Sequence, residues 1–206
     1  SEIRQILSVT GPLQINYNIF PRDFSIERLK GLLVERDDIP QGASIGVEVI
    51  EVEQLDVATL ARESRLLSEH GLKTYIDDFG SGYSNLAALT TLPVTGVKLD
   101  KSFGLASSDS LQARMLPNVL GLVAAANHQV IVEGVETASR LEELRQTGYV
   151  DLVQGYYFSA PLSADAFLAW MCENKLGDLT RQIAGIGNDD PGTRAVNAAI
   201  RSASTR

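Results

Sequence analysis

The chain has 206 residues, of which 44% are hydrophobic and 21% are charged, and its formal net charge is −8. This length and composition suit one globular domain with a sizeable core. An acidic chain of this kind lacks the basic surface that binds long nucleic acids, so we exclude them as partners.

Cysteine, histidine and the apolar runs exclude further classes. Cys172 is the single cysteine, so an internal disulfide is excluded, as in proteins of reducing compartments. Two histidines rule out a histidine-rich zinc site, and any metal must therefore rest on oxygen ligands. No apolar run approaches the ~20 residues of a membrane span, and no signal peptide is visible. We expect a cytoplasmic domain, on its own or within a larger membrane-bound protein.

The first third of the chain alternates strand-like and helix-like segments. Strands are expected over 13–17 and 45–50, and Glu48 lies between valines in the second of them. Strand alternation alone allows Glu48 to face solvent. That orientation is common in antiparallel sheets and is less expected in a barrel that is wrapped in helices. Helices are expected from Ser25, which can act as N-cap, and over 55–70.

A central β-α-β unit over 73–103 carries charges on its strands. A strand over 74–76 runs into Asp77 and Asp78, and a second strand over 97–99 carries Lys98 between apolar neighbours. Ser84 should cap the intervening helix and Pro93 should end it. Adjacent carboxylates repel each other unless a cation lies between them. From this pair alone, a turn with two solvated acids and a site for a hard cation such as Mg²⁺ remain equal alternatives.

The last third continues the alternation. A helix is expected over 111–126, where Pro117 implies a kink or a later start. A strand over 129–135 carries Glu133, a short strand lies near 154, and Thr137 and Ser163 can cap the helices that follow. We assign 1–176 to one barrel domain and 177–206 to a polar C-terminal extension, in which 187–193 is a linker and 195–203 a helix.

Strands that alternate with helices predict a parallel sheet and, at this length, a TIM-like α/β barrel. Polar residues lie in or at the ends of the six expected strands, and parallel strands would bring them to one end of the barrel. These residues are Asn18, Glu48, Asp77, Asp78, Lys98, Glu133 and Gln154.

Five motifs resemble those of the EAL-domain cyclic-di-GMP phosphodiesterases. The first two motifs are Asn-Ile-Phe-Pro-Arg-Asp-Phe, which begins at Asn18, and Glu-Val-Ile-Glu, which begins at Glu48. The third begins at Asp77 with Asp-Asp-Phe-Gly-Ser-Gly-Tyr-Ser and continues with Leu-Pro and then Lys-Leu-Asp-Lys-Ser-Phe, which begins at Lys98. The last two are Val-Glu-Gly-Val-Glu-Thr, which contains Glu133, and Gln-Gly-Tyr-Tyr-Phe-Ser, which begins at Gln154. The resemblance covers about residues 5–172 and implies the hydrolysis of cyclic di-GMP to linear pGpG with two Mg²⁺ or Mn²⁺ ions, with Ca²⁺ as an inhibitor.

The resemblance also assigns roles. It implies metal ligation by Asn18, Glu48, Asp77, Asp78 and Glu133, with Glu133 as general base and Lys98 as the group that neutralises charge near the phosphate. Gln154 is implied near the guanine of the substrate. Asp100 matches a family position that lies near the substrate and the metal-bound water. Glu136 matches a position that supports the metal ligands, and Glu51 matches one that steadies the loop after the Asp77–Asp78 strand.

Three departures keep a second function open. Phe20 stands where the family has Ser, Ile50 where it has Thr, and no Glu-Ala-Leu triplet occurs. The resemblance places this triplet on an early strand, upstream of the Asn18 motif, and only seventeen residues precede Asn18. We therefore expect the source protein to continue upstream of Ser1 with the family's first two strands. The alternative is an incomplete barrel that needs a partner. The alternative function is a catalytically inactive cyclic-di-GMP receptor or protein-interaction module. A homodimer and a fused sensory or GGDEF-type domain are compatible with either function.

Overall fold

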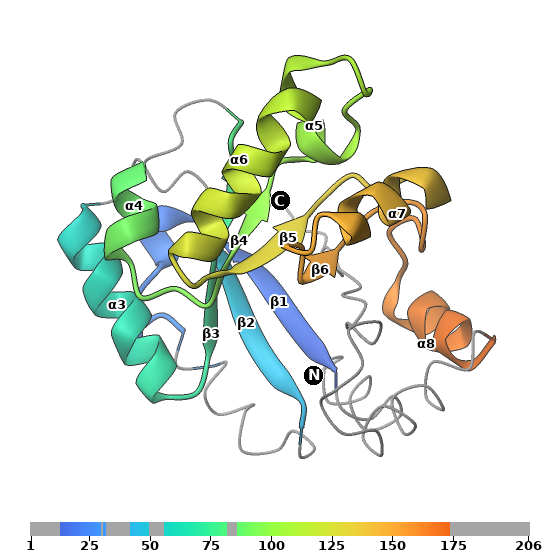
Figure 1. Cartoon of the computed structure of the whole chain (residues 1–206). Helices are drawn as coiled ribbons and strands as arrows, with labels where there is room; N and C mark the ends of the chain where they lie inside the picture. Colours follow the sequence, from blue (N-terminus) through green and yellow to red (C-terminus); the bar gives the residue numbers. More distant parts are fainter. Residues whose placement is uncertain (1–12, 30, 32–41, 50–55, 82–85, 174–206) are drawn as a thin grey trace.

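The computed structural model describes most of the expected barrel. The described residues are 13–29, 31, 42–49, 56–81 and 86–173. They form a single curled sheet with helices on its outer side (Figure 1). Ser84, Ile50, Glu51 and the expected linker and helix beyond residue 177 lie outside the described residues.

Six parallel strands lie side by side in the order in which they occur along the chain. Each neighbouring pair is parallel, so each connection crosses back over the sheet, which is the arrangement of a TIM-like barrel. Within the described ranges the sheet is open, with β1 and β6 at its edges. The strands are β1 (Gln14–Ile19), β2 (Ser44–Val49), β3 (Lys73–Phe79), β4 (Gly96–Leu99), β5 (Gln129–Val132) and β6 (Leu152–Val153).

The helices lie in the connections between the strands and after β6. They are the 3-10 turn η1 (Pro21–Asp23) and the α-helices α3 (Val57–Glu69), α4 (Leu86–Thr91), α5 (Lys101–Gly104), α6 (Leu111–Ala125), α7 (Ala138–Gln146) and α8 (Ala164–Glu173).

Side-chain caps fix where several helices begin. The expected helix over 55–70 is confirmed as α3, and Asp56 caps it by accepting from the backbone N–H of Thr59 at 3.0 Å. Thr137 caps α7 as expected, accepting from the N–H of Arg140. Pro117 does not delay α6, because Ser110 caps that helix one residue before Leu111.

Two expectations need correction. The strand expected over 129–135 ends at Val132, because Gly134 takes a φ of +76° that a strand cannot continue. The short helix α5 was not expected from the sequence. Asp100 begins it by accepting from the N–H of Ser102 at 2.9 Å, immediately after β4 ends.

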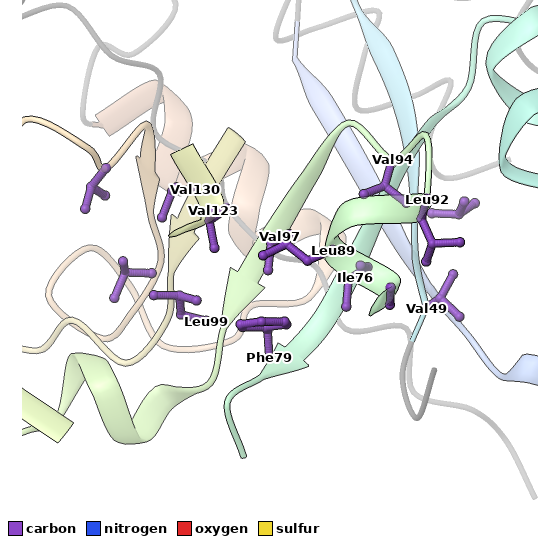
Figure 2. Packing of buried hydrophobic residues seen from close by; sticks show 14 of the residues in the cluster. Val49, Ile76, Phe79, Leu89, Leu92, Val94, Val97, Leu99, Val123 and Val130 are labelled. Atoms are coloured by element: carbon purple, nitrogen blue, oxygen red, sulfur yellow. The ribbon is translucent and has the colours of Figure 1, made fainter. Parts of the chain in front are cut away.

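The outer face of the sheet forms the main core. Val97 and Leu99 of β4 point toward the helices, where they meet Leu89 of α4 and Val123 of α6 (Figure 2). Each of these side chains is at most 1% exposed, and burying one stabilises the fold by about 1.5–3 kcal/mol. Because side chains alternate along a strand, Lys98 between them must point to the opposite, inner face.

Candidate active site

The inner face of the sheet is polar where the outer face is apolar. In the parallel register Asn18 lies opposite Glu48, and Glu48 lies opposite Tyr75. Residues two apart share a face, so Asp77 follows Tyr75 inward and Lys98 lies on the same side. The polar residues of successive strands are thereby collected at the carboxyl ends of the strands, where barrel enzymes hold their chemistry.

Lys98 lies at the centre of three carboxylates from three other strands or strand ends. Its Nζ is 2.6 Å from Glu48 Oε2, 3.0 Å from Asp77 Oδ1 and 2.5 Å from Glu133 Oε1. The Lys98 side chain is only 3% exposed, and those of Glu48 and Asp77 are 6% and 7% exposed. Glu48 therefore does not face solvent, which the sequence had left open.

The pKa of Lys98 reflects a balance of opposing effects. Burial by itself lowers the pKa of an ammonium group, but Glu48, Asp77 and Glu133 outweigh it and hold the pKa of Lys98 above its usual range. Lys98 is therefore a permanent cation at neutral pH.

A local irregularity in β3 places two consecutive carboxylates at the same site. Regular alternation would send Asp77 and Asp78 to opposite faces. The register of β3 with β4 shifts between Ile76 and Phe79, and Asp78 takes a left-handed φ of 53° while its N–H donates to Asp77 Oδ1 at 3.0 Å. A carboxylate oxygen from each of Asp77, Asp78 and Glu133 consequently lies within 4.8 Å of the others.

Asp78 is the most exposed of these acids, yet it is not an ordinary surface carboxylate. Burial, then the negative charges of Asp77 and Asp100, raise its pKa above the usual value, against the opposing effects of Lys98 and Lys101. A cation at this point would relieve that repulsion.

Glu133 is not part of a strand, and its backbone is held in position by close packing against Gly104 of α5. It follows β5 directly, and a Cβ placed on Gly104 would lie 1.8 Å from its carbonyl oxygen. Burial raises the pKa of Glu133, Lys98 opposes that rise, and Asp77 and Glu48 add to it. A carboxylate with a raised pKa is a stronger proton acceptor than an ordinary one.

The other predicted residues lie at or just beyond the ends of the strands. Asn18 is exposed near the carboxyl end of β1, and Glu136 is exposed just before α7. Asp100 caps α5 and is close enough to influence Asp78. Gln154 follows β6, and its backbone bonds to Val132 O and to Val135 N at 2.9 and 3.1 Å, so it flanks Glu133. Glu51 lies outside the described residues.

The sequence placed Asn16 near the end of the same strand as Asn18, but Asn16 was set aside in favour of Asn18 and assigned no role. Asn16, two residues before Asn18 on β1, donates from Nδ2 to Glu48 Oε1 at 2.8 Å. The signal was present, because Gln14, Asn16 and Asn18 alternate with apolar or aromatic residues along β1 and so share one face.

The donor set fits divalent cations. Glu48, Asp77, Asp78 and Glu133 offer carboxylate oxygens, the ligands that Mg²⁺ and Mn²⁺ prefer, and Asn18 adds an amide oxygen at the same end of the sheet. Lys98 cannot balance four carboxylates with one positive charge, so the cluster keeps a net negative charge. Negative charge that is buried and uncompensated is what a bound cation stabilises.

The sequence profile of the EAL domain matches residues 2–161. The chain belongs to the EAL domain family. This EAL domain is 39% identical over 119 residues to a protein named probable cyclic di-GMP phosphodiesterase PdeG of Escherichia coli K12, a match that spans 57% of this chain and 23% of that protein. The chain spans between 16% and 24% of the length of the first four curated relatives it matches.

Solved structures of EAL proteins have the same fold. The EAL domain of Mycobacterium smegmatis DcpA superposes with a TM-score of 0.72 at 26% identity, covering 84% of this chain and 78% of that one. A standalone EAL protein from Vibrio cholerae O395, solved in a c-di-GMP-bound form, gives a TM-score of 0.63 at 30% identity, covering 79% and 70%. The expectation of a TIM-like EAL barrel is thereby confirmed.

In the part of the chain that the structure describes, no helix combines the length and the apolar character that a membrane crossing requires.

Proposed function

We propose that this EAL domain hydrolyses one phosphodiester bond of cyclic di-GMP to give linear pGpG. The observation that carries the proposal is the cluster around Lys98, in which three carboxylates contact one buried ammonium while Asp78 lies beside them without that contact. Curated relatives are named as cyclic di-GMP phosphodiesterases, and the Vibrio cholerae structure binds the nucleotide.

The proposal includes two Mg²⁺ or Mn²⁺ ions. Asp77, Asp78 and Glu133 would hold them, because an oxygen of each lies within 4.8 Å of the others. Glu48, which contacts the same Lys98, and Asn18, which pairs with Glu48 in the strand register, would complete the ligand set. When bound, two such ions clamp the attacking and leaving oxygens of a phosphodiester and lower the pKa of a water molecule.

The chain's own side chains carry the remaining work. Glu133 accepts the proton of the attacking water, a role for which its raised pKa is favourable. Lys98, permanently charged, stabilises the negative charge that develops on the phosphate. Gln154 reaches the guanine from a backbone fixed beside Glu133, and Asp100 binds at the substrate and its water.

The decisive experiment is turnover of cyclic di-GMP by the full-length protein with Mn²⁺, with nucleotide products separated by anion-exchange chromatography. We expect pGpG to accumulate, turnover to stop with excess chelator, and Mg²⁺ or Mn²⁺ to restore it. Ca²⁺ should inhibit, because it is larger and less strict in its geometry. Unchanged turnover in excess chelator contradicts the metal site.

The same experiment decides the alternative. Phe20, in place of the family's Ser, is a large side chain that is 53% exposed after β1, and this departure favours a receptor. A protein that binds cyclic di-GMP and never hydrolyses it would have that function. The expected cytoplasmic location, a homodimer and a fused sensory or GGDEF-type domain remain part of the proposal, and gel filtration of the full-length protein tests the homodimer.

A further inference from the structure

Below the carboxylate cluster, the inner face of the sheet carries a chain of hydrogen-bonded side chains that the proposed chemistry does not use. It runs from Lys73 at the start of β3 through Gln14 and Asn16 on β1 to Glu48. Tyr75 joins it from the side, accepting from Gln14 Nε2 at 2.8 Å.

Asn16 reaches Glu48 because its neighbour has no side chain. Asn16 pairs with Gly46 in the register of β1 with β2, and a Cβ on Gly46 would lie 2.3 Å from Asn16 Oδ1. The amide therefore lies over Gly46, and its Nδ2 is 2.8 Å from Glu48 Oε1. Since Lys98 is 2.6 Å from Glu48 Oε2, both carboxylate oxygens of Glu48 have a donor.

The groups at the two ends of this series of hydrogen bonds, Lys73 and Glu48, determine which atom donates in each bond. Lys73 can only donate, and its Nζ is 2.7 Å from Gln14 Oε1, so the nitrogen of Gln14 faces Asn16. The oxygen of Asn16 accepts from that nitrogen at 3.0 Å, which turns its own nitrogen toward Glu48. Glu48, as a carboxylate, can only accept. A reversed amide at Asn16 would put an oxygen against the carboxylate and a nitrogen against the nitrogen of Gln14.

Tyr75, on the same strand β3 as Lys73, holds these hydrogen-bonded side chains in place. It is fully buried, its ring fills the space over Gly46 and Gly96, and its hydroxyl donates to Gln129 Oε1 at 3.3 Å. Burial raises the pKa of Tyr75 to about 12, so the hydroxyl remains neutral and keeps its proton.

We infer that Asn16 is a positioning residue for Glu48, and that Lys73, Gln14 and Tyr75 fix its amide so that it orients the Glu48 carboxylate toward the bound cation. This inference rests on the proposed metal site. Loss of an outer partner of a metal ligand typically weakens metal affinity by about 10- to 100-fold.

The test measures Mn²⁺ affinity of the full-length protein by isothermal titration calorimetry, with the melting temperature followed in parallel. Asn16→Leu keeps approximate volume and removes both hydrogen bonds, and it should bind Mn²⁺ about 10- to 100-fold more weakly. In the Glu48→Gln background the same substitution should have no further effect on affinity, because the carboxylate that Asn16 orients is gone. Gln146→Leu is the matched control, since it removes an amide-to-carboxylate hydrogen bond, to Glu142 Oε1 at 3.2 Å, on the exposed side of α7 and outside this network. It should leave Mn²⁺ affinity unchanged.

The outcomes separate the inference from the function on which it rests. If wild type binds Mn²⁺ and Asn16→Leu binds it equally well, the inference is wrong and the metal site stands. The inference also fails if Asn16→Leu weakens affinity equally in both backgrounds, because the effect is then one of general packing. Wild-type protein that binds no Mn²⁺ overturns the metal site and this inference together.

Discussion

The two faces of the sheet are built on opposite principles. On β4, Val97 and Leu99 point outward into an apolar core, whereas Lys98 between them points inward to three carboxylates (Figure 2 shows the outer face). The outer face stabilises the fold through area removed from water. The inner face buries charged groups, and the free energy needed to remove them from water can be as large as their mutual attraction. The charges of the inner face therefore stabilise the fold little, and their role lies in what they can bind.

The largest expected effect on the inner face concerns catalysis. Glu133→Gln keeps size and hydrogen bonding and removes the charge, so kcat should fall by about 10²- to 10⁴-fold. Cyclic di-GMP should still bind in the presence of Ca²⁺. Steady-state kinetics on the full-length protein measure the first effect and equilibrium dialysis the second.

Gln154→Ala is the matched comparison for Glu133→Gln. It should weaken nucleotide binding with a smaller effect on kcat, because Gln154 is proposed at the base and not at the phosphate. A Glu133→Gln variant with near wild-type kcat would show that Glu133 is not the general base.

Removing the central cation should affect stability most. Lys98→Met leaves Glu48, Asp77 and Glu133 buried together without their shared partner. Breaking a buried pair on one side typically costs about 3–5 kcal/mol. Urea denaturation in chelator measures the loss, and Lys101→Met, at an exposed position of α5, should change stability by no more than about 0.5 kcal/mol. Equal losses in the two variants would count against the central role of Lys98.

On the outer face, a cavity should lower the stability of the fold and leave metal binding on the inner face unchanged. Leu120 of α6 is fully buried, and Leu120→Ala should cost about 2–5 kcal/mol. Mn²⁺ affinity should be unchanged at temperatures where the variant is folded. The control is Leu122→Ala on the same helix, since Leu122 is 41% exposed. If Leu120→Ala weakens Mn²⁺ binding as much as it lowers stability, the two faces are not separable.

The smallest expected change in stability is at Asp78, where a substitution should raise stability and not lower it. Its pKa in the folded protein is raised above its unfolded value, so the folded state holds the proton more tightly. Its ionised form therefore costs stability at neutral pH in the metal-free protein. Asp78→Asn should be slightly more stable there, by no more than about 1 kcal/mol because the side chain is exposed.

The pH dependence checks the sign of this effect. The advantage of Asp78→Asn should shrink as the pH falls below the raised pKa and vanish below the ordinary Asp value, because both side chains are then neutral. Asn also tolerates the left-handed φ of 53°. Asp78→Ala, which removes the same charge without that tolerance, should be the less stable variant in thermal melts with chelator.

Much of the fold could be predicted because its signals are local. Alternation of apolar residues, caps such as Thr137 and stops such as Pro93 predicted the strands and, apart from the short helix α5, the helices of the described regions in the right order. The parallel barrel followed from that order. The convergence of Glu48, Asp77, Lys98 and Glu133 was also expected from strand ends, and the structure brings these four together, while their roles remain predictions.

The sequence by itself determined which side chains stand at the strand ends and that their chemistry is that of oxygen ligands around one lysine. Only the tertiary structure decided how they meet. The left-handed turn at Asp78, the glycines that let α5 touch the backbone of Glu133, and the amide of Asn16 on Glu48 all depend on cross-strand register and close approach. Those are set by contacts between residues distant in the chain, and the periodicity within a single segment carries no information about them.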